Sequence, residues 1–206
     1  MARVQQEFYQ KFAPLSQHEL QKPIVFVVDM INGFIKEGAL HDPAILSCGD
    51  AIKRLLTDID CRRIFVADAH PPKTREFQSY PSHCVIGTAE SEVISELQPY
   101  VEELFYKNST NAFTADDFQT FLGSDLDMYR DIIITGCCTD ICIMQFSLCL
   151  NAWLNEHNKT NHRIIIPMDC VDTYHIEELH DVQTNNQFAL TNMQANGILI
   201  VASMVR

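Results

Sequence analysis

A cysteine in the stretch IIITGCCTDICIMQF has the features of a nucleophile. The apolar run 132–135 predicts a strand that ends at Gly136, and Thr139 is then well placed as the N-cap of a following helix. Cys142 falls at the third position of that helix. Unpaired backbone N–H groups and aligned peptide dipoles stabilise an anion there, so this thiol is expected to lose its proton more easily than a free cysteine.

Two charged residues that also follow predicted strands complete a reactive group with Cys142. Asp29 comes after the run 24–28, and Lys107 comes after the run 104–106. A carboxylate next to the thiol can take its proton, while an ammonium holds that carboxylate and favours negative charge in the site. The three residues therefore predict a nucleophilic unit with Asp29 as the base.

The segment DAHPPKTREFQSYPSHC carries a second group of reactive side chains. It contains a mixed carboxylate and imidazole set: Asp68, His70, Glu76 and His83. Such a set suits Zn²⁺, Fe²⁺ or Mn²⁺ better than Ca²⁺. The alternative is that histidines in a proline-rich loop are surface residues, and spacing alone leaves both interpretations open.

The elements that must position these residues follow from hydrophobic patterning. Six short runs rich in β-branched residues predict buried strands: 24–28, 63–67, 104–106, 132–135, 163–168 and 198–202. Segments with helical spacing lie between them, such as 44–57 and 139–156. The alternation predicts an α/β fold with a mostly parallel six-stranded sheet and helices on both faces, in which ligands bind beyond the carboxyl ends of the strands.

Polar residues follow five of these strands. In chain order they are Asp29, Asp68 with His70, Lys107, the segment 136–142, and Asp169. A single Asp after a strand often caps the next helix or turn. Its recurrence after several strands favours a shared site at one edge of the sheet.

One domain is predicted over residues 1–206, with residues 1–22 as an N-terminal extension. Val4, Phe8 and Phe12 have helical spacing in that extension, so we expect a helix packed on the domain or on a neighbouring subunit. No chemistry is assigned to it.

The composition excludes several classes of function. A net charge of -12, spread over the whole chain, argues against a nucleic-acid partner. No apolar run approaches the roughly 20 residues that cross a bilayer, and the N-terminus lacks a signal-like stretch, so we expect a cytoplasmic protein without a membrane partner. Most of the eight cysteines are interpreted as reduced residues that pack in the core.

The sequence resembles nicotinamidases and other isochorismatase-like cysteine hydrolases over nearly its whole length. GCCTDIC resembles their G-x-x-T-D-x-C signature, VVDMINGF their first-strand motif, and ELFYKNSTNAF their lysine motif. The resemblance implies that Asp29, Lys107 and Cys142 are catalytic. It also implies a non-proline cis peptide between Cys137 and Cys138, and an oxyanion hole formed by the backbone N–H groups of Cys138 and Cys142.

The metal-binding pattern of nicotinamidases is similar too: D-x-H-P, an acidic residue or Ser before a Phe, and an aromatic-P-x-H-C segment. The resemblance implies one divalent metal, with zinc favoured over iron or manganese, held by Asp68, His70, Glu76 and His83. In that family the metal coordinates the ring nitrogen of nicotinamide, which orients the carboxamide toward the thiolate.

Three positions depart from the family pattern. Tyr80 stands where many nicotinamidases have Trp, Gly33 replaces an acidic residue, and Thr110 occupies a position often filled by Tyr. Phe34 and Tyr80 are candidate walls for a flat aromatic amide, with simple packing as the alternative.

These features predict hydrolysis of nicotinamide to nicotinate and ammonia through a thioester. One alternative is hydrolysis of another small amide or a ureido or carbamoyl compound, and another is a metal- or redox-binding module without turnover. Isochorismate cleavage is disfavoured because that vinyl-ether chemistry needs no thiol. Family members commonly self-associate, so a homo-oligomer is expected.

Overall fold

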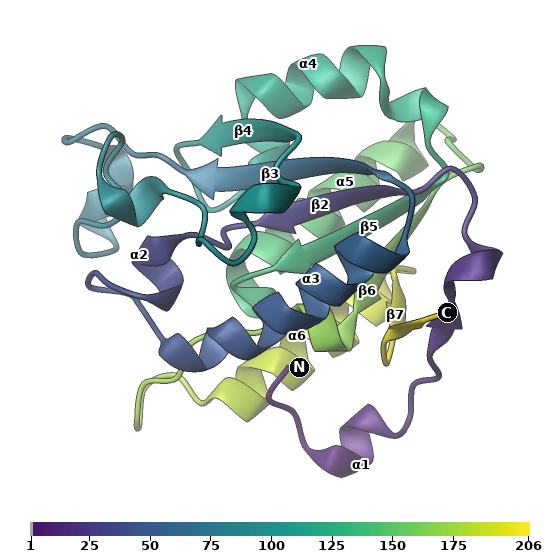
Figure 1. The fold of residues 1–206 in the computed structure, drawn as a ribbon, viewed down its shortest axis with the longest axis horizontal. Coiled ribbons are helices and arrows are strands. Elements are labelled where there is room, and N and C mark those ends of the chain that lie inside the picture. Colours follow the sequence, from purple (N-terminus) through teal and green to yellow (C-terminus); the bar gives the residue numbers. More distant parts are fainter. Residues whose placement is uncertain (1) are drawn as a thin grey trace.

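A computed structural model describes residues 2–206 and places six parallel strands in one sheet (Figure 1). The strands are β2 (Ile24–Val28), β3 (Arg62–Asp68), β4 (Glu103–Lys107), β5 (Asp131–Gly136), β6 (Arg163–Pro167) and β7 (Leu199–Val201). Their order across the sheet is β4-β3-β2-β5-β6-β7, and every neighbouring pair is parallel. The predicted α/β fold is confirmed, with each strand within a few residues of its expected place.

Helices cover both faces of this sheet (Figure 1). The helix α3 (Leu46–Asp58) and the short α2 (Asn32–Ile35) pack on one face, and α4 (Asp116–Ser124), α5 (Met144–Glu156) and α6 (Val182–Ala195) pack on the other. The remaining short elements are α1 (Gln6–Tyr9), β1 (Leu15–Ser16), β8 (Met204–Val205), a π-helical turn at Thr139–Ile143, and 3-10 turns at Gln17–Glu19, Pro43–Ile45, Arg75–Gln78, Ala89–Ser91, Gln98–Tyr100, Ala112–Thr114, Leu126–Met128 and Met168–Cys170.

The central strand β2 shows why helices must pack on both faces of the sheet. All five of its residues are buried, because successive side chains point to opposite faces and each face has a helical layer. On one face, Phe26 packs edge-to-face against Phe118, Phe121 and Phe146 with ring centroids 5.4–5.7 Å apart. On the other face, Val27 belongs to the cluster that includes the α3 side chains.

The N-terminal extension differs from the expected helix. Within 2–22, the α-helical part is the single turn α1, and Met1 lies outside the described residues. Pro14 lacks a backbone N–H, and the chain around it is extended beside the C-terminal segment. There the N–H of Ala202 donates to the carbonyl of Ala13 at 3.0 Å, and the N–H of Leu15 donates to that of Ser203 at 2.9 Å. A partner distant in sequence thus satisfies the backbone groups that a helix would have paired internally.

Arg3 ties this extension to two loops beyond the carboxyl end of the sheet. Its Nε donates to Asp172 Oδ2 at 2.8 Å and its Nη2 donates to Asp42 Oδ2 at 2.9 Å. Asp172 is fully buried, and its second oxygen accepts from Asn186 Nδ2 at 2.8 Å. Since a buried carboxylate needs partners for both oxygens, this network holds both loops in place.

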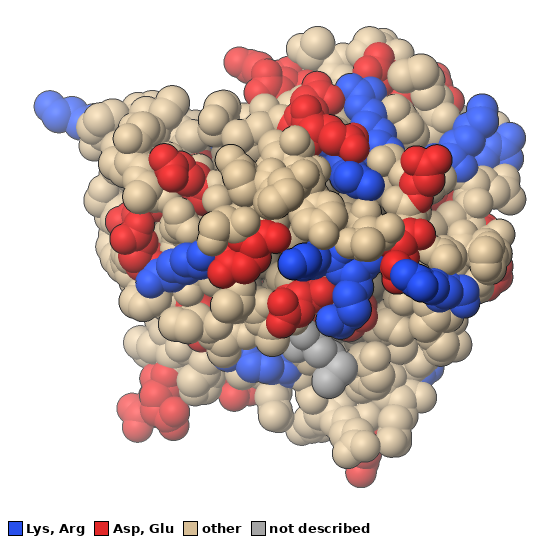
Figure 2. All heavy atoms as spheres, in the orientation of Figure 1, with Lys and Arg blue, Asp and Glu red and all other residues tan. Residues whose placement is uncertain are grey.

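Charged side chains of both signs are interspersed on the face shown in Figure 2. Among residues 2–206, no helix has both the length and the apolar character needed to cross a membrane.

Candidate active site

Asp29 follows β2 in a backbone conformation that few residues adopt. Its φ is +53°, in the left-handed region, where Asp and Asn are tolerated better than most side chains. Its N–H donates to the carbonyl of Val66 at 2.8 Å, and its Oδ1 accepts from the N–H of Asp68 at 3.0 Å. The neighbouring strand β3 therefore fixes both the turn and the direction of the carboxylate, as is common where strain is kept at a functional site.

Lys107 lies between two carboxylates at the end of β4. Its Nζ is 2.8 Å from Asp29 Oδ2 and 2.5 Å from Asp68 Oδ1, and it also donates to the carbonyl of Ser109 at 3.2 Å. The sulfur of Cys142 is 3.7 Å away. Because Asp68 and Lys107 are paired residues in the β3–β4 register, the ion pair follows directly from the sheet. Burial opposes the charged form, yet Asp29 and Asp68 hold the pKa of Lys107 well above its ordinary value.

The helix that carries Cys142 begins one residue earlier than predicted. Thr139 is the first residue of the π-helical turn, and the extended Cys138 is its N-cap, so the expectation that Thr139 caps the helix is wrong. The Thr139 N–H donates to the carbonyl of Asp172 at 3.1 Å, a contact from a distant loop. Cys142 is thus the fourth residue of the turn, and its sulfur still reaches the cavity although the residue is 5% exposed.

The expected ease of ionisation of Cys142 is also corrected. Burial raises the pKa of its thiol well above the ordinary value, and the nearby Asp29 and Asp68 add to this although Lys107 opposes it. Burial and the Asp68 carboxylate likewise raise the pKa of Asp29 to about 7. A carboxylate oxygen of Asp29 lies within 4.8 Å of the Cys142 sulfur. Burial therefore opposes ionisation of the thiol, which needs a base to lose its proton.

The loop before Cys142 passes very close to β2. Gly136 has φ of +113°, and a Cβ at this position would lie 1.9 Å from the carbonyl oxygen of Val28, so only glycine fits. The peptide between Cys137 and Cys138 is cis, as the resemblance implied. Cys138 lines the cavity, and among residues 2–206 its N–H has no hydrogen-bond acceptor.

The four predicted metal ligands come together beside this unit. Asp68, His70, Glu76 and His83 each offer a donor atom within 4.8 Å of the others. His70 Nδ1 is 2.8 Å from Asn108 Oδ1, and His83 Nδ1 is 2.8 Å from the carbonyl of Pro81. These contacts place the protons on Nδ1 and leave both Nε2 atoms free to bind a metal. The buried Nε2 of His70 has no hydrogen-bond partner in the described part of the chain, which a metal would supply.

Asp169, the fifth residue expected at this edge, is not part of the site. The strand β6 ends at Pro167, and the turn Met168–Cys170 directs Asp169 into a separate cavity lined also by Arg54 and Asp58. Its N–H donates to the carbonyl of Ala202 at 3.3 Å, next to the paired chain ends.

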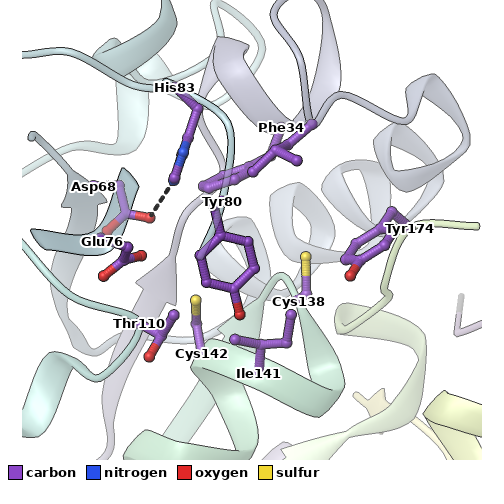
Figure 3. A pocket seen from close by; sticks show the side chains of 11 residues that line it. Phe34, Asp68, Glu76, Tyr80, His83, Thr110, Cys138, Ile141, Cys142 and Tyr174 are labelled. Atoms are coloured by element: carbon purple, nitrogen blue, oxygen red, sulfur yellow. Dashed lines mark ion pairs between the residues drawn. The ribbon is translucent and has the colours of Figure 1, made fainter. Parts of the chain in front are cut away.

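The cavity above Cys142 has a volume of about 390 Å³, its open mouth included (Figure 3). Its lining consists of Phe34, Leu40, Asp68, Glu76, Tyr80, His83, Thr110, Cys138, Ile141, Cys142 and Tyr174. The carboxylates and imidazole lie at one end, and aromatic and aliphatic side chains line the rest. The structure therefore brings both expected wall residues, Phe34 and Tyr80, to the cavity that contains the thiol.

The comparison with protein-family models identifies the family of this chain. The model of the isochorismatase domain matches residues 23–202. This chain belongs to the isochorismatase family. Membership of the family supports the expectation that the chain is a hydrolytic enzyme.

Relatives of this isochorismatase-family chain include named amidases. It is 28% identical over 167 residues to Nicotinamidase 1 of Arabidopsis thaliana, a match that spans 72% of this chain and 65% of that protein. A nicotinamidase structure from Bacillus subtilis superimposes with a TM-score of 0.70 at 22% identity, covering 88% of this chain and 99% of that one. A pyrazinamidase of Pyrococcus horikoshii in complex with zinc gives 0.64 at 20% identity, covering 88% and 99%. At these identities the two structures establish the fold alone.

Three wall residues of this isochorismatase-family pocket were missing from the sequence prediction: Leu40, Ile141 and Tyr174. Ile141 could have been predicted, because it lies next to Cys142 in the turn that carries the signature motif. Leu40 and Tyr174 come from irregular loops in which no periodicity indicates a direction for the side chain.

Proposed function

We propose that this enzyme hydrolyses a small aromatic amide, with nicotinamide favoured, to a carboxylic acid and ammonia. The observation that carries the proposal is the contact of Lys107 with Asp29 and Cys142, at the edge of a four-residue metal-ligand cluster. The name of the Arabidopsis relative supports nicotinamide as the substrate.

The first half of the reaction uses the buried thiol. Asp29 takes the proton of Cys142, and Lys107, held at 2.8 Å from Asp29, stabilises the negative charge that remains in the site. The thiolate attacks the amide carbonyl, so that a C–S bond forms and the carbonyl π electrons move to oxygen. The N–H groups of Cys138 and Cys142 are the proposed donors to this oxyanion, and the free N–H of Cys138 supports that role.

The second half releases both products. Asp29 returns its proton to the amide nitrogen, the C–N bond breaks, and ammonia leaves while the acyl group remains on Cys142 as a thioester. Asp29 then deprotonates a water molecule, which attacks the thioester carbonyl. Cleavage of the C–S bond, with return of the proton to sulfur, yields the carboxylic acid and restores the thiol.

The side chains around the thiol hold the ring of the substrate. Phe34 and Tyr80 wall a flat aromatic group on the way to Cys142 and exclude water from it. Asp68, His70, Glu76 and His83 would hold a divalent metal, with zinc favoured over iron or manganese. When bound, the metal supplies an electrophilic anchor for a ring nitrogen.

Loss of one imidazole should separate substrate anchoring from chemistry. Loss of a residue that only hydrogen-bonds to a metal ligand typically weakens metal binding ~10–100-fold, and the variant His70→Ala, which removes a ligand itself, is expected to weaken it more. The same variant should raise KM more than it lowers kcat. Elemental analysis and steady-state kinetics measure the two effects. His18→Ala, at an exposed histidine outside the site, is the matched control. An unchanged metal content in His70→Ala would show that His70 is not a ligand.

The direct test of the proposed function incubates the purified protein with nicotinamide. We expect stoichiometric ammonia and nicotinate, together with about one divalent metal per chain by elemental analysis. A panel of small amides and N-carbamoyl compounds, assayed for ammonia, separates nicotinamide turnover from the alternatives. Release of ammonia from none of them, combined with reversible oxidation of the cysteines, would favour the binding module without turnover.

A further inference from the structure

Tyr174 closes the end of the pocket opposite the metal-ligand cluster. In Figure 3, Asp68, Glu76 and His83 lie on one side, and Tyr174 lies on the other, beyond Cys138. Tyr174 belongs to the irregular segment between β6 and α6. A ring anchored at the cluster and presented to the thiol therefore has its remote edge directed toward Tyr174.

His180 stacks on the ring of Tyr174. The two rings are stacked, with centroids 4.0 Å apart and an interplanar angle of 17°. His180 Nδ1 is also 2.9 Å from the carbonyl oxygen of Tyr174. The stack and the hydrogen bond together restrict both the side chain and the backbone of Tyr174.

Asp140 connects this support to the turn that carries the nucleophile. It lies two residues before Cys142, and its Oδ2 is 2.8 Å from His180 Nε2. Its Oδ1 accepts a hydrogen bond at 2.5 Å from the hydroxyl of Thr173, the residue that precedes Tyr174 in the chain. The thiol and the end wall of the pocket are thus attached to the same short turn, so their separation is fixed.

The segment is held on its other side as well. The N–H of Thr173 donates to Asp172 Oδ1 at 2.9 Å, and Arg3 donates to both Asp172 Oδ2 and the carbonyl of Thr173. Beyond residue 174 the same segment becomes exposed, with Leu179 84% accessible. Tyr174 is therefore anchored where it faces the pocket, and the exposed residues that follow it lead back to the contact of His180 with Asp140.

We propose that Tyr174 is a specificity-determining residue that limits the length of the substrate, and that His180 is the positioning residue that keeps the ring of Tyr174 in place. As a statement about substrates, this rests on the proposed function. The enzyme then accepts aromatic amides with an unsubstituted ring and rejects those whose ring carries a bulky group on the edge away from the metal cluster. Leu40 and Ile141 contribute aliphatic side chains to the lining, so shortening Tyr174 admits an apolar substituent.

The substrate test compares kcat/KM for nicotinamide with that for its 5-phenyl derivative, whose substituent lies away from the ring nitrogen, and with that for its 6-phenyl derivative, whose substituent lies beside that nitrogen. Tyr174→Ala should raise the ratio of the 5-phenyl derivative to nicotinamide at least ~10-fold and leave the ratio of the 6-phenyl derivative unchanged, and His180→Ala should move the 5-phenyl ratio in the same direction. Tyr174→Phe, which keeps the ring, should leave the ratio near the wild-type value. His175→Ala, at a half-exposed histidine of the same segment, is the matched control. A merely structural role would lower all rates together and leave the ratio unchanged, which would overturn the proposal.

A second measurement does not depend on amide turnover. The rates at which iodoacetamide and the bulkier N-phenylmaleimide alkylate Cys142 are followed by tandem mass spectrometry of the modified peptide. Tyr174→Ala should increase the relative rate of the bulky reagent about 10-fold, and Tyr174→Leu serves if the alanine variant does not fold. An unchanged ratio of the two alkylation rates would refute the proposal that Tyr174 limits the length of the pocket. A shifted ratio in an enzyme that releases ammonia from no amide would refute the proposed function and leave the end wall standing.

Discussion

Replacing Cys142 by alanine is expected to abolish ammonia release, by a factor on the order of 10⁵ or more. The sulfur lies 3.7 Å from Lys107 Nζ, and none of the other sulfur atoms is in contact with that ammonium among the described residues. Among the described residues, no other thiol therefore lies beside Lys107 to act as the nucleophile of the proposed reaction. The fold and the metal content should be retained, because alanine is smaller and the ion pairs of Lys107 with Asp29 and Asp68 do not involve the sulfur.

The measurement is ammonia release at saturating nicotinamide, with circular dichroism and elemental analysis on the same samples. Cys61→Ala removes a half-buried thiol outside the pocket and should retain wild-type activity. Substantial turnover by Cys142→Ala would end the thioester mechanism, whatever the behaviour of the other variants.

The second large effect is expected for Asp29→Asn, which should lower kcat by roughly 10²–10⁴-fold. Asparagine has nearly the same shape and tolerates the φ of +53° at this position, so the turn after β2 should persist. It cannot take a proton from the thiol. The amide also offers one oxygen where the carboxylate offers two, to Lys107 and to the N–H of Asp68, so a loss of about 1–3 kcal/mol in unfolding free energy accompanies the change.

Pre-steady-state kinetics localise the defect of Asp29→Asn, since formation of the acyl-enzyme and its hydrolysis should both slow. Asp50→Asn, at an exposed position of α3, is the control for loss of one negative charge. If Asp29→Asn formed the thioester at the normal rate and failed only to hydrolyse it, another base would have to deprotonate Cys142.

Much of the site could be predicted because its residues follow regular elements. The run 24–28 is apolar and β-branched on both faces, which fits only a buried parallel strand, and Asp29 must then emerge at the carboxyl edge. The same reasoning placed Asp68, Lys107 and Cys142 at that edge, and the structure brings them together.

The errors arose where distant contacts decide local structure. Thr139 appeared to be an N-cap, but its N–H is taken by the carbonyl of Asp172, which no local pattern reveals. The extension around Leu15 has apolar residues at helical spacing nearby, yet it pairs with the other end of the chain. The thiol of Cys142 was judged from the helix dipole alone, whereas burial is the largest influence on its pKa and raises it.

The spacing of the charged residues along the chain ties the chemistry to cooperative folding. Asp29, Asp68, Lys107 and Cys142 are separated by 39, 39 and 35 residues, so no short fragment can assemble them. Lys107 is contributed by β4, which hydrogen-bonds to a single neighbour at the margin of the sheet. Fraying of that margin would remove the Lys107 ammonium from between Asp29 and Asp68. The rate at which an alkylating reagent reaches the Cys142 thiol is therefore expected to report local opening of β4 as well as global unfolding.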